Sequence, residues 1–141
     1  MVRNPIVAGQ FYPASASQLK EMIKGMVDEK AEKEEVIGLI SPHAGYIYSG
    51  PVAGATISRI KFKDTFIIIG PNHTGGGKPL SIMTEGVWKT PLGNVEIDSE
   101  LARQILKEVE NNLHSLGRQS LEDLVRIKGI GPAKAITLLA A

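Results

Sequence analysis

Two histidines follow apolar runs in the chain, and each stands in a setting where imidazole can do chemistry. His43 lies in LISPHAGYIYSGP, shortly after residues 36–41, and His73 lies in FIIIGPNHTGGG, shortly after residues 65–70. Imidazole is the commonest protein ligand for Zn, Fe and Cu, and it titrates near neutral pH. The two residues are therefore candidate ligands of a divalent metal, or an acid–base pair.

A role without chemistry is the alternative for each histidine. A single histidine in a loop is usually polar surface or a satisfied hydrogen-bonding group. A catalytic metal site generally uses three protein ligands, and the third histidine, His114, falls in the helical tail. The sequence leaves open whether His114 is only a loop residue or folds back towards the pair.

The elements that would position His43 and His73 form a βαβ unit. Apolar runs at residues 36–41 and 65–70 predict two buried strands, and small residues at 50–60 predict a helix with Pro51 in its first turn. Parallel strands with a right-handed crossover bring both histidines to one edge of the sheet, where open α/β sheets bind ligands.

Further elements complete an α/β fold with a partial three-layer sheet. Residues 15–35 predict an amphipathic helix, and residues 80–84 predict a third strand. Pro91 and Gly93 interrupt the stretch 87–98, which therefore predicts a hairpin or sheet edge.

From Ser99 the pattern becomes all-α, and we expect a boundary that separates residues 1–100 from residues 101–141. Residues 99–112 predict a helix capped by Ser99, with an apolar face of Leu101, Ile105, Leu106 and Val109. Ser120 and Asp123 have the spacing of a capping box for a second helix.

The end of the chain, RIKGIGPAKAITLLAA, predicts a helix-hairpin-helix. Gly129 and Gly131 allow a tight turn whose free amides, at the start of a helix, attract a phosphate oxygen. Lys128 and Lys134 add positive charge, and Ile130 is expected to point inward and hold the hairpin. The motif predicts weak binding to a nucleic-acid backbone. The alternative is a packing hairpin without a ligand.

Composition narrows the classes of protein further. The chain has 141 residues, a formal net charge of +1 and no cysteine, so disulfides and thiolate zinc sites are excluded. No apolar run reaches the roughly 18 residues that span a bilayer, and the amino-terminal stretch does not resemble a signal peptide. We expect a cytoplasmic protein without a membrane partner.

Four stretches, NPIVAGQFYP, SPHAGYIYSGPVAGA, IIGPNHTGGG and WKTPLGNVEID, closely resemble the Memo-like family (AmmeMemoRadiSam system protein B). The resemblance covers residues 1 to about 102 in order. It implies a fold similar to the class III non-haem-iron dioxygenases and a metal site that uses His43 and His73. Members of that family are about twice as long, and their other half supplies further site residues, including a cysteine. The resemblance therefore implies that one copy of this chain lacks a full site.

Residues 101–141 resemble the helix-hairpin-helix region of the RadC DNA-repair family, without the JAB-type domain that follows it there. This resemblance leads to the hypothesis of a recombined or engineered chimera, in which a truncated Memo-like metal-binding domain precedes a RadC-like hairpin and catalytic activity is not expected. The alternatives are a DNA-binding module without sequence preference and a Memo-like metal-dependent protein. A truncated sheet exposes an edge or an apolar face, so we also expect a homo-oligomer.

Overall fold

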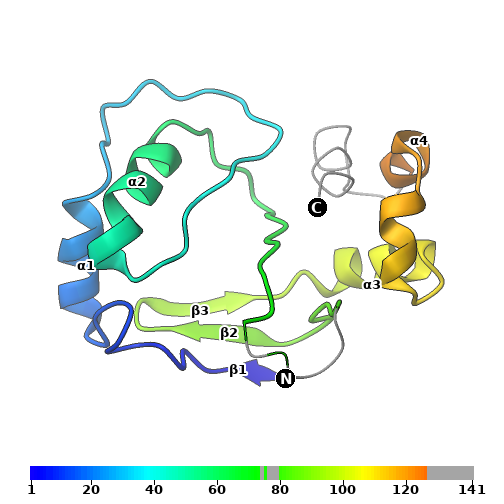
Figure 1. Cartoon of the computed structure of the whole chain (residues 1–141), viewed down its shortest axis with the longest axis horizontal. Coiled ribbons are helices and arrows are strands. Elements are labelled where there is room, and N and C mark those ends of the chain that lie inside the picture. Colours follow the sequence, from blue (N-terminus) through cyan, green and yellow to red (C-terminus); the bar gives the residue numbers. More distant parts are fainter. Residues whose placement is uncertain (74, 76–79, 127–141) are drawn as a thin grey trace. The chain divides into compact units, whose positions relative to one another are not determined.

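The computed structural model describes residues 1–73, 75 and 80–126 (Figure 1). The chain divides into two compact units. The first unit contains Met1–Phe62 and Val87–Glu96. The second contains Lys63–Gly86 and the described residues from Ile97 onward. Neither unit is continuous in sequence, because β2 and β3 belong to the first unit while the chain on both sides of them belongs to the second.

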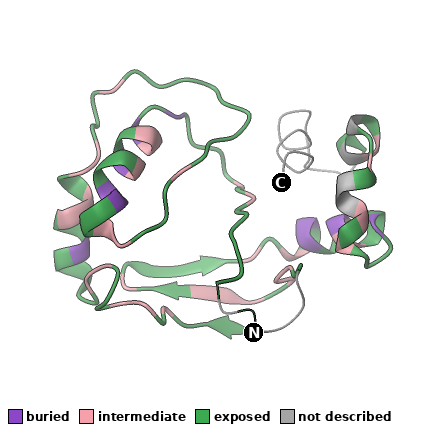
Figure 2. Cartoon of the chain, viewed as in Figure 1, coloured by how far each residue is buried: buried purple, intermediate pink, exposed green. Residues whose placement is uncertain are grey.

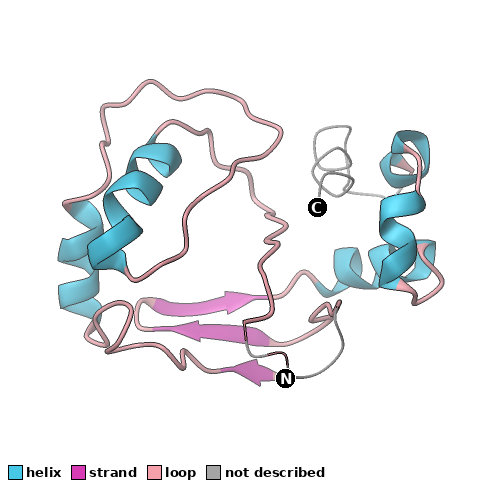
Figure 3. Cartoon of the chain, in the orientation of Figure 1, coloured by secondary structure: helices cyan, strands magenta, loops and turns pink. Residues whose placement is uncertain are grey.

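The first unit holds a small three-stranded sheet in the order β1-β2-β3 (Figure 3). Strand β1 (Val2–Arg3) pairs in parallel with β2 (Val87–Thr90), and β2 pairs antiparallel with β3 (Gly93–Glu96). The β2–β3 hairpin confirms the prediction for residues 87–98. Its turn closes where Gly93 takes φ +136° and the Thr90 hydroxyl donates to the Gly93 carbonyl at 2.9 Å, a backbone conformation that glycine adopts without a steric penalty.

Helix α2 (Tyr46–Ser58) packs closely, through its small residues, against the segment that follows α1 (Ala16–Lys24). A Cβ atom at Gly54 would collide with the backbone oxygen of Met26, just beyond α1. Ser58 accepts a hydrogen bond from the Asp28 amide at 2.8 Å and donates one to the Gly54 carbonyl at 2.6 Å. The absence of a side chain at Gly54 is therefore what allows α2 to approach the main chain at Met26.

Helix α2 begins earlier than the sequence predicts. It starts at Tyr46, so Pro51 lies inside the helix and not in its first turn. The start is fixed from outside the helix, because the Tyr46 amide donates to the Phe11 carbonyl at 2.8 Å. A contact this distant in sequence is not visible in the local pattern.

The strands predicted at residues 36–41, 65–70 and 80–84 are wrong, because the structure shows these residues as loops (Figure 3). The predicted βαβ unit and its three layers are therefore absent from the described residues, and the fold is a mixed α/β arrangement with one small sheet. Just before the first run, Glu34 forms an isolated bridge with Ile60. A strand requires a regular ladder with a neighbour that accepts and donates along its edge, and a local apolar run does not specify that ladder.

The second unit is built on α3 (Ser99–Glu108), followed by a 3₁₀ turn (Leu113–Arg118) and α4 (Leu121–Val125). Leu101, Ala102, Ile105 and Val109 are buried along one side of α3, close to the predicted apolar face. The predicted N-cap is wrong by one residue, because the Asp98 side chain accepts the Leu101 amide at 3.0 Å. At α4 the predicted capping box is confirmed: Ser120 and Asp123 exchange side-chain-to-amide hydrogen bonds.

Candidate functional site

His43 lies in the loop that leads into α2, and its neighbours hold the backbone there. The Ser49 hydroxyl donates to the Ala44 carbonyl at 3.0 Å, and the Tyr46 amide donates to the Phe11 carbonyl at 2.8 Å. The His43 side chain is exposed. The sequence therefore fixes the main chain on the carboxyl side of His43 while leaving the imidazole accessible from solvent.

Tyr46, three residues after His43, contacts Tyr12 with ring centroids 5.4 Å apart and planes inclined at 47°. Burial raises the pKa of Tyr46 above its ordinary value, and the charge of Tyr12 raises it further. Tyr46 therefore stays protonated at neutral pH and acts as a neutral neighbour of the loop, not as a base. The sequence analysis did not single out this pair, although Tyr12 and Tyr46 both lie in the stretches that carry the family resemblance.

His73 lies in the second unit, in a loop whose turn is stabilised by its own side chains. The Asn72 side-chain oxygen accepts the Gly75 amide at 3.1 Å, and Gly75 has φ +66°, a left-handed conformation that favours glycine. The His73 side chain is exposed. Part of the GPNHTGGG motif is thus explained by local turn geometry.

The predicted pairing of His43 with His73 stays a prediction, because the two residues belong to different units. His114 lies in the 3₁₀ turn of the second unit, and its backbone amide donates to the side-chain oxygen of Asn112 at 3.2 Å. Within residues 1–73, 75 and 80–126, no three or more His, Asp or Glu residues gather in a way that could hold a metal ion.

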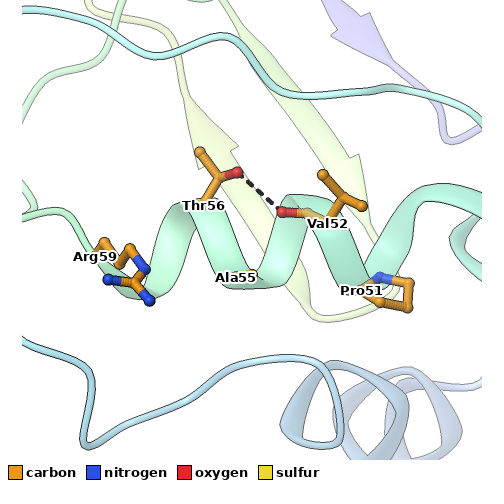
Figure 4. Close-up of a pocket in the computed structure, with 5 residues that line it drawn as sticks. All are labelled: Pro51, Val52, Ala55, Thr56 and Arg59. Carbon is orange, nitrogen blue, oxygen red and sulfur yellow. Dashed lines mark hydrogen bonds between the residues drawn. The ribbon is translucent and has the colours of Figure 1, made fainter.

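The surface of the first unit includes two depressions that no histidine lines. One, of about 380 Å³, is lined by Pro51, Val52, Ala55, Thr56 and Arg59 on α2 (Figure 4). The other, of about 590 Å³, lies between the 9–15 segment and the helices, with Tyr12, Met22 and Ile47 among its lining residues. The lining of the first depression is largely apolar, which is unlike a catalytic cleft with convergent polar groups.

The predicted nucleic-acid contacts fall on Lys128, Gly129, Ile130, Gly131 and Lys134, and all five lie outside the described residues. The helix-hairpin-helix and its binding to DNA therefore stay predictions. Of the helices in the described part of the chain, none combines the length and apolar character needed to cross a bilayer.

The sequence profile of the family described as "Memo-like protein" matches residues 3–122. A MEMO1 family protein of Nitrosopumilus maritimus is 46% identical over 121 residues, which cover 79% of this chain and 42% of the relative. A MEMO1 family protein of Methanococcoides burtonii is 50% identical over 103 residues, covering 72% of this chain and 39% of the relative. A MEMO1 family protein of Methanococcus maripaludis strain C6 is 43% identical over 141 residues, covering 86% of this chain and 49% of the relative.

These matches bear on the predictions in two ways. The chain spans half or less of the length of these relatives. The family match includes both histidine loops, and it also includes residues 101–122, which the sequence analysis placed in the RadC-like segment. The resemblance to the Memo-like family is confirmed, whereas the RadC-like part and the chimera stay hypotheses without support.

Proposed function

The chain belongs to the Memo-like protein family, and on that basis we propose that it is the part of a Memo-like metal-binding protein that carries two histidine ligands, His43 and His73. The observation that carries the proposal is the family match, which spans both histidine loops. Both side chains are exposed and each stands beside a locally fixed turn.

The donor set fits part of a metal site and not the whole of one. Two imidazoles suit Fe, Zn or Cu, but a catalytic site generally needs a third protein ligand, and the chain contains no cysteine. We therefore place the remaining ligands in the portion of a relative's length that these 141 residues do not span. A bound metal would supply Lewis acidity or redox chemistry there, and this chain by itself is proposed to bind metal weakly and without turnover.

The residues around each histidine hold its main chain. Near His43, the hydrogen bond from Ser49 to Ala44 limits movement of the loop. Near His73, the turn between Asn72 and Gly75 does the same. A ligand whose backbone is already fixed loses less conformational entropy on binding, so these contacts favour metal binding without touching the metal.

Calorimetric titration of the chain with Zn²⁺ tests the proposal, since zinc is redox-inert and accepts imidazole nitrogen. We expect His43→Ala and His73→Ala each to weaken binding by about tenfold or more, as the loss of one of two ligands requires. His114→Ala is the matched control and should leave the affinity unchanged. Binding that survives both single changes, or that falls equally with His114→Ala, would show that the assignment is wrong.

A further inference from the structure

The sulfur of Met26 lies against α2 at a point where the helix has no side chain. A Cβ atom built at Gly50 would lie 2.5 Å from the Met26 sulfur and 2.7 Å from its terminal methyl carbon, closer than the Cβ atoms of real side chains come. Gly50 and Gly54 stand one turn apart on the buried side of α2, whose buried residues are purple in Figure 2. Glycine at position 50 therefore leaves the room that the thioether of Met26 fills.

Hydrogen bonds hold the main chain on both sides of this methionine. The Met26 amide donates to the Ile23 carbonyl at 2.9 Å, and the Asp28 amide donates to the Ser58 hydroxyl at 2.8 Å. The first bond ties Met26 to α1, and the second ties Asp28 to the last residue of α2. Because the backbone is fixed in this way, the Met26 side chain leaves α2 only if it changes its rotamer or if α2 itself moves away.

The buried side of α2 is a poor place for an added polar atom. The amides of Gly50 and Gly54 lie inside the helix, where each donates to the carbonyl four residues earlier. The Ser58 hydroxyl donates to the Gly54 carbonyl at 2.6 Å. An oxygen atom placed on the Met26 sulfur would therefore lie against groups whose donors are already used, and a polar atom without a hydrogen bond is costly to bury.

We propose that Met26 is an oxidation site of the first unit, at which hydrogen peroxide converts the thioether to a sulfoxide and thereby releases α2 from the segment that follows α1. Met26 is half-buried, so part of the residue contacts the solvent that carries the oxidant. The sulfur lone pair attacks one peroxide oxygen, the O–O bond breaks, an S–O bond forms and water leaves. Sulfur loses two electrons and the peroxide gains them. A polar sulfoxide disrupts apolar packing.

The release would extend to the loop that carries His43. A Cβ atom built at Gly50 would also lie 3.6 Å from the Tyr46 Cβ atom, so the Met26 sulfur contacts α2 at its first turn. The His43 loop enters α2 through the N-cap, Gly45. Oxidation at Met26 is therefore expected to loosen the main chain beside His43. The inference rests on the packing of Met26 and does not depend on metal binding.

Peroxide treatment of the 141-residue chain tests the proposal. Mass spectrometry of its peptides gives the oxidised fraction at each methionine, and urea denaturation of the same sample gives the midpoint. We expect the midpoint to fall by roughly 0.5 M or more as Met26 becomes oxidised, and to stay unchanged while only Met1, which is 81% exposed, is oxidised. An unchanged midpoint after Met26 is oxidised would overturn the proposal. So would a Met26 that stays reduced when the other half-buried methionines, Met22 and Met83, are fully oxidised.

Met26→Leu removes the sulfur and keeps an apolar side chain of similar volume, a change that cores usually tolerate. We expect this variant to fold and to lose the response of the midpoint to peroxide. Met22→Leu is the matched control, because Met22 is half-buried in the same unit and the variant keeps Met26. It should show the full fall in midpoint. A fall of the same size in Met26→Leu would assign the effect to another residue.

A measurement on the unaltered chain covers the case in which Met26→Leu does not fold. Amide hydrogen exchange is compared between the reduced chain and the fraction that carries the sulfoxide at Met26. We expect exchange to become about tenfold faster at residues 44–58, since local opening sets these rates, and to stay unchanged in α3 of the second unit. Equal exchange at residues 44–58 in the two samples would show that the sulfoxide does not release α2.

Discussion

At Gly54 the backbone of α2 approaches the backbone of Met26 so closely that no side chain fits between them. Alanine is the better helix former by about 1 kcal/mol, but here its methyl group would displace a main-chain carbonyl. We expect Gly54→Ala to lower the free energy of unfolding by about 1–3 kcal/mol, the usual cost of overpacking. Urea denaturation measures this. Gly70→Ala, where nothing lies within 4 Å of the added carbon, should be neutral or slightly stabilising.

Tyr46 makes the folding stability of the first unit depend on pH in the alkaline range. Its folded-state pKa is raised above the ordinary value of 10.0 by burial first and by Tyr12 second. The unfolded chain therefore loses this proton at lower pH than the folded chain does. The stability that the neutral phenol contributes is complete below about pH 10 and declines as the pH rises towards the folded pKa.

Denaturant midpoints recorded between about pH 8 and pH 11 check this sign. We expect the midpoint of the unaltered chain to fall more steeply above pH 10 than that of Tyr46→Phe. Tyr48→Phe, which keeps Tyr46 and alters an exposed ring, should show the full decline. A Tyr46→Phe curve that overlies the unaltered one would contradict the attribution to this phenol.

At the scale of elements, the N-cap of α3 differs between prediction and structure: the sequence predicts Ser99, and the structure shows Asp98. Both Asp98 and Ser99 are good N-cap residues, and the pattern alone cannot choose between neighbours. In the structure Asp98 accepts the Leu101 amide at 3.0 Å, while the Ser99 hydroxyl makes a longer contact of 3.4 Å to the Ile97 carbonyl. We expect Asp98→Ala to cost about 1 kcal/mol and Ser99→Ala to cost little, as measured by thermal unfolding. Equal losses would assign the cap to both residues.

The elements that the sequence predicted correctly depend on contacts a few residues apart. The hairpin at 87–98 depends on its own turn, and the capping box depends on residues three apart. The runs 36–41 and 65–70 have the composition of buried strands, but a strand exists only where another strand pairs with it. Neither run is a strand in the structure, and Ile40 and Ile68 are exposed there.

At the scale of the whole molecule, the two units interleave along the chain. The boundary predicted near residues 99–101 follows the change in local pattern, whereas the compact units are divided at 62–63, 86–87 and 96–97. A boundary of this kind depends on contacts distant in sequence, so composition cannot locate it. For the same reason the candidate metal site could be predicted only as a pair of residues. Each histidine loop is encoded locally, but bringing His43 to His73 requires an arrangement of units that no short stretch specifies.

The pairing of β1 with β2 has a consequence for how the chain matures. Val2 and Arg3 pair with Val87 and Trp88, which lie more than 80 residues later in the chain. During synthesis, β1 therefore cannot pair until residues 87–88 have left the ribosome. Until then the first residues stay open to proteases, and loop closure over that span carries an entropic cost. Arg3 then lies 4.7 Å from the ring centre of Trp88, the chain's single tryptophan. Indole fluorescence of Trp88 can therefore report when, during folding, the amino end pairs with β2.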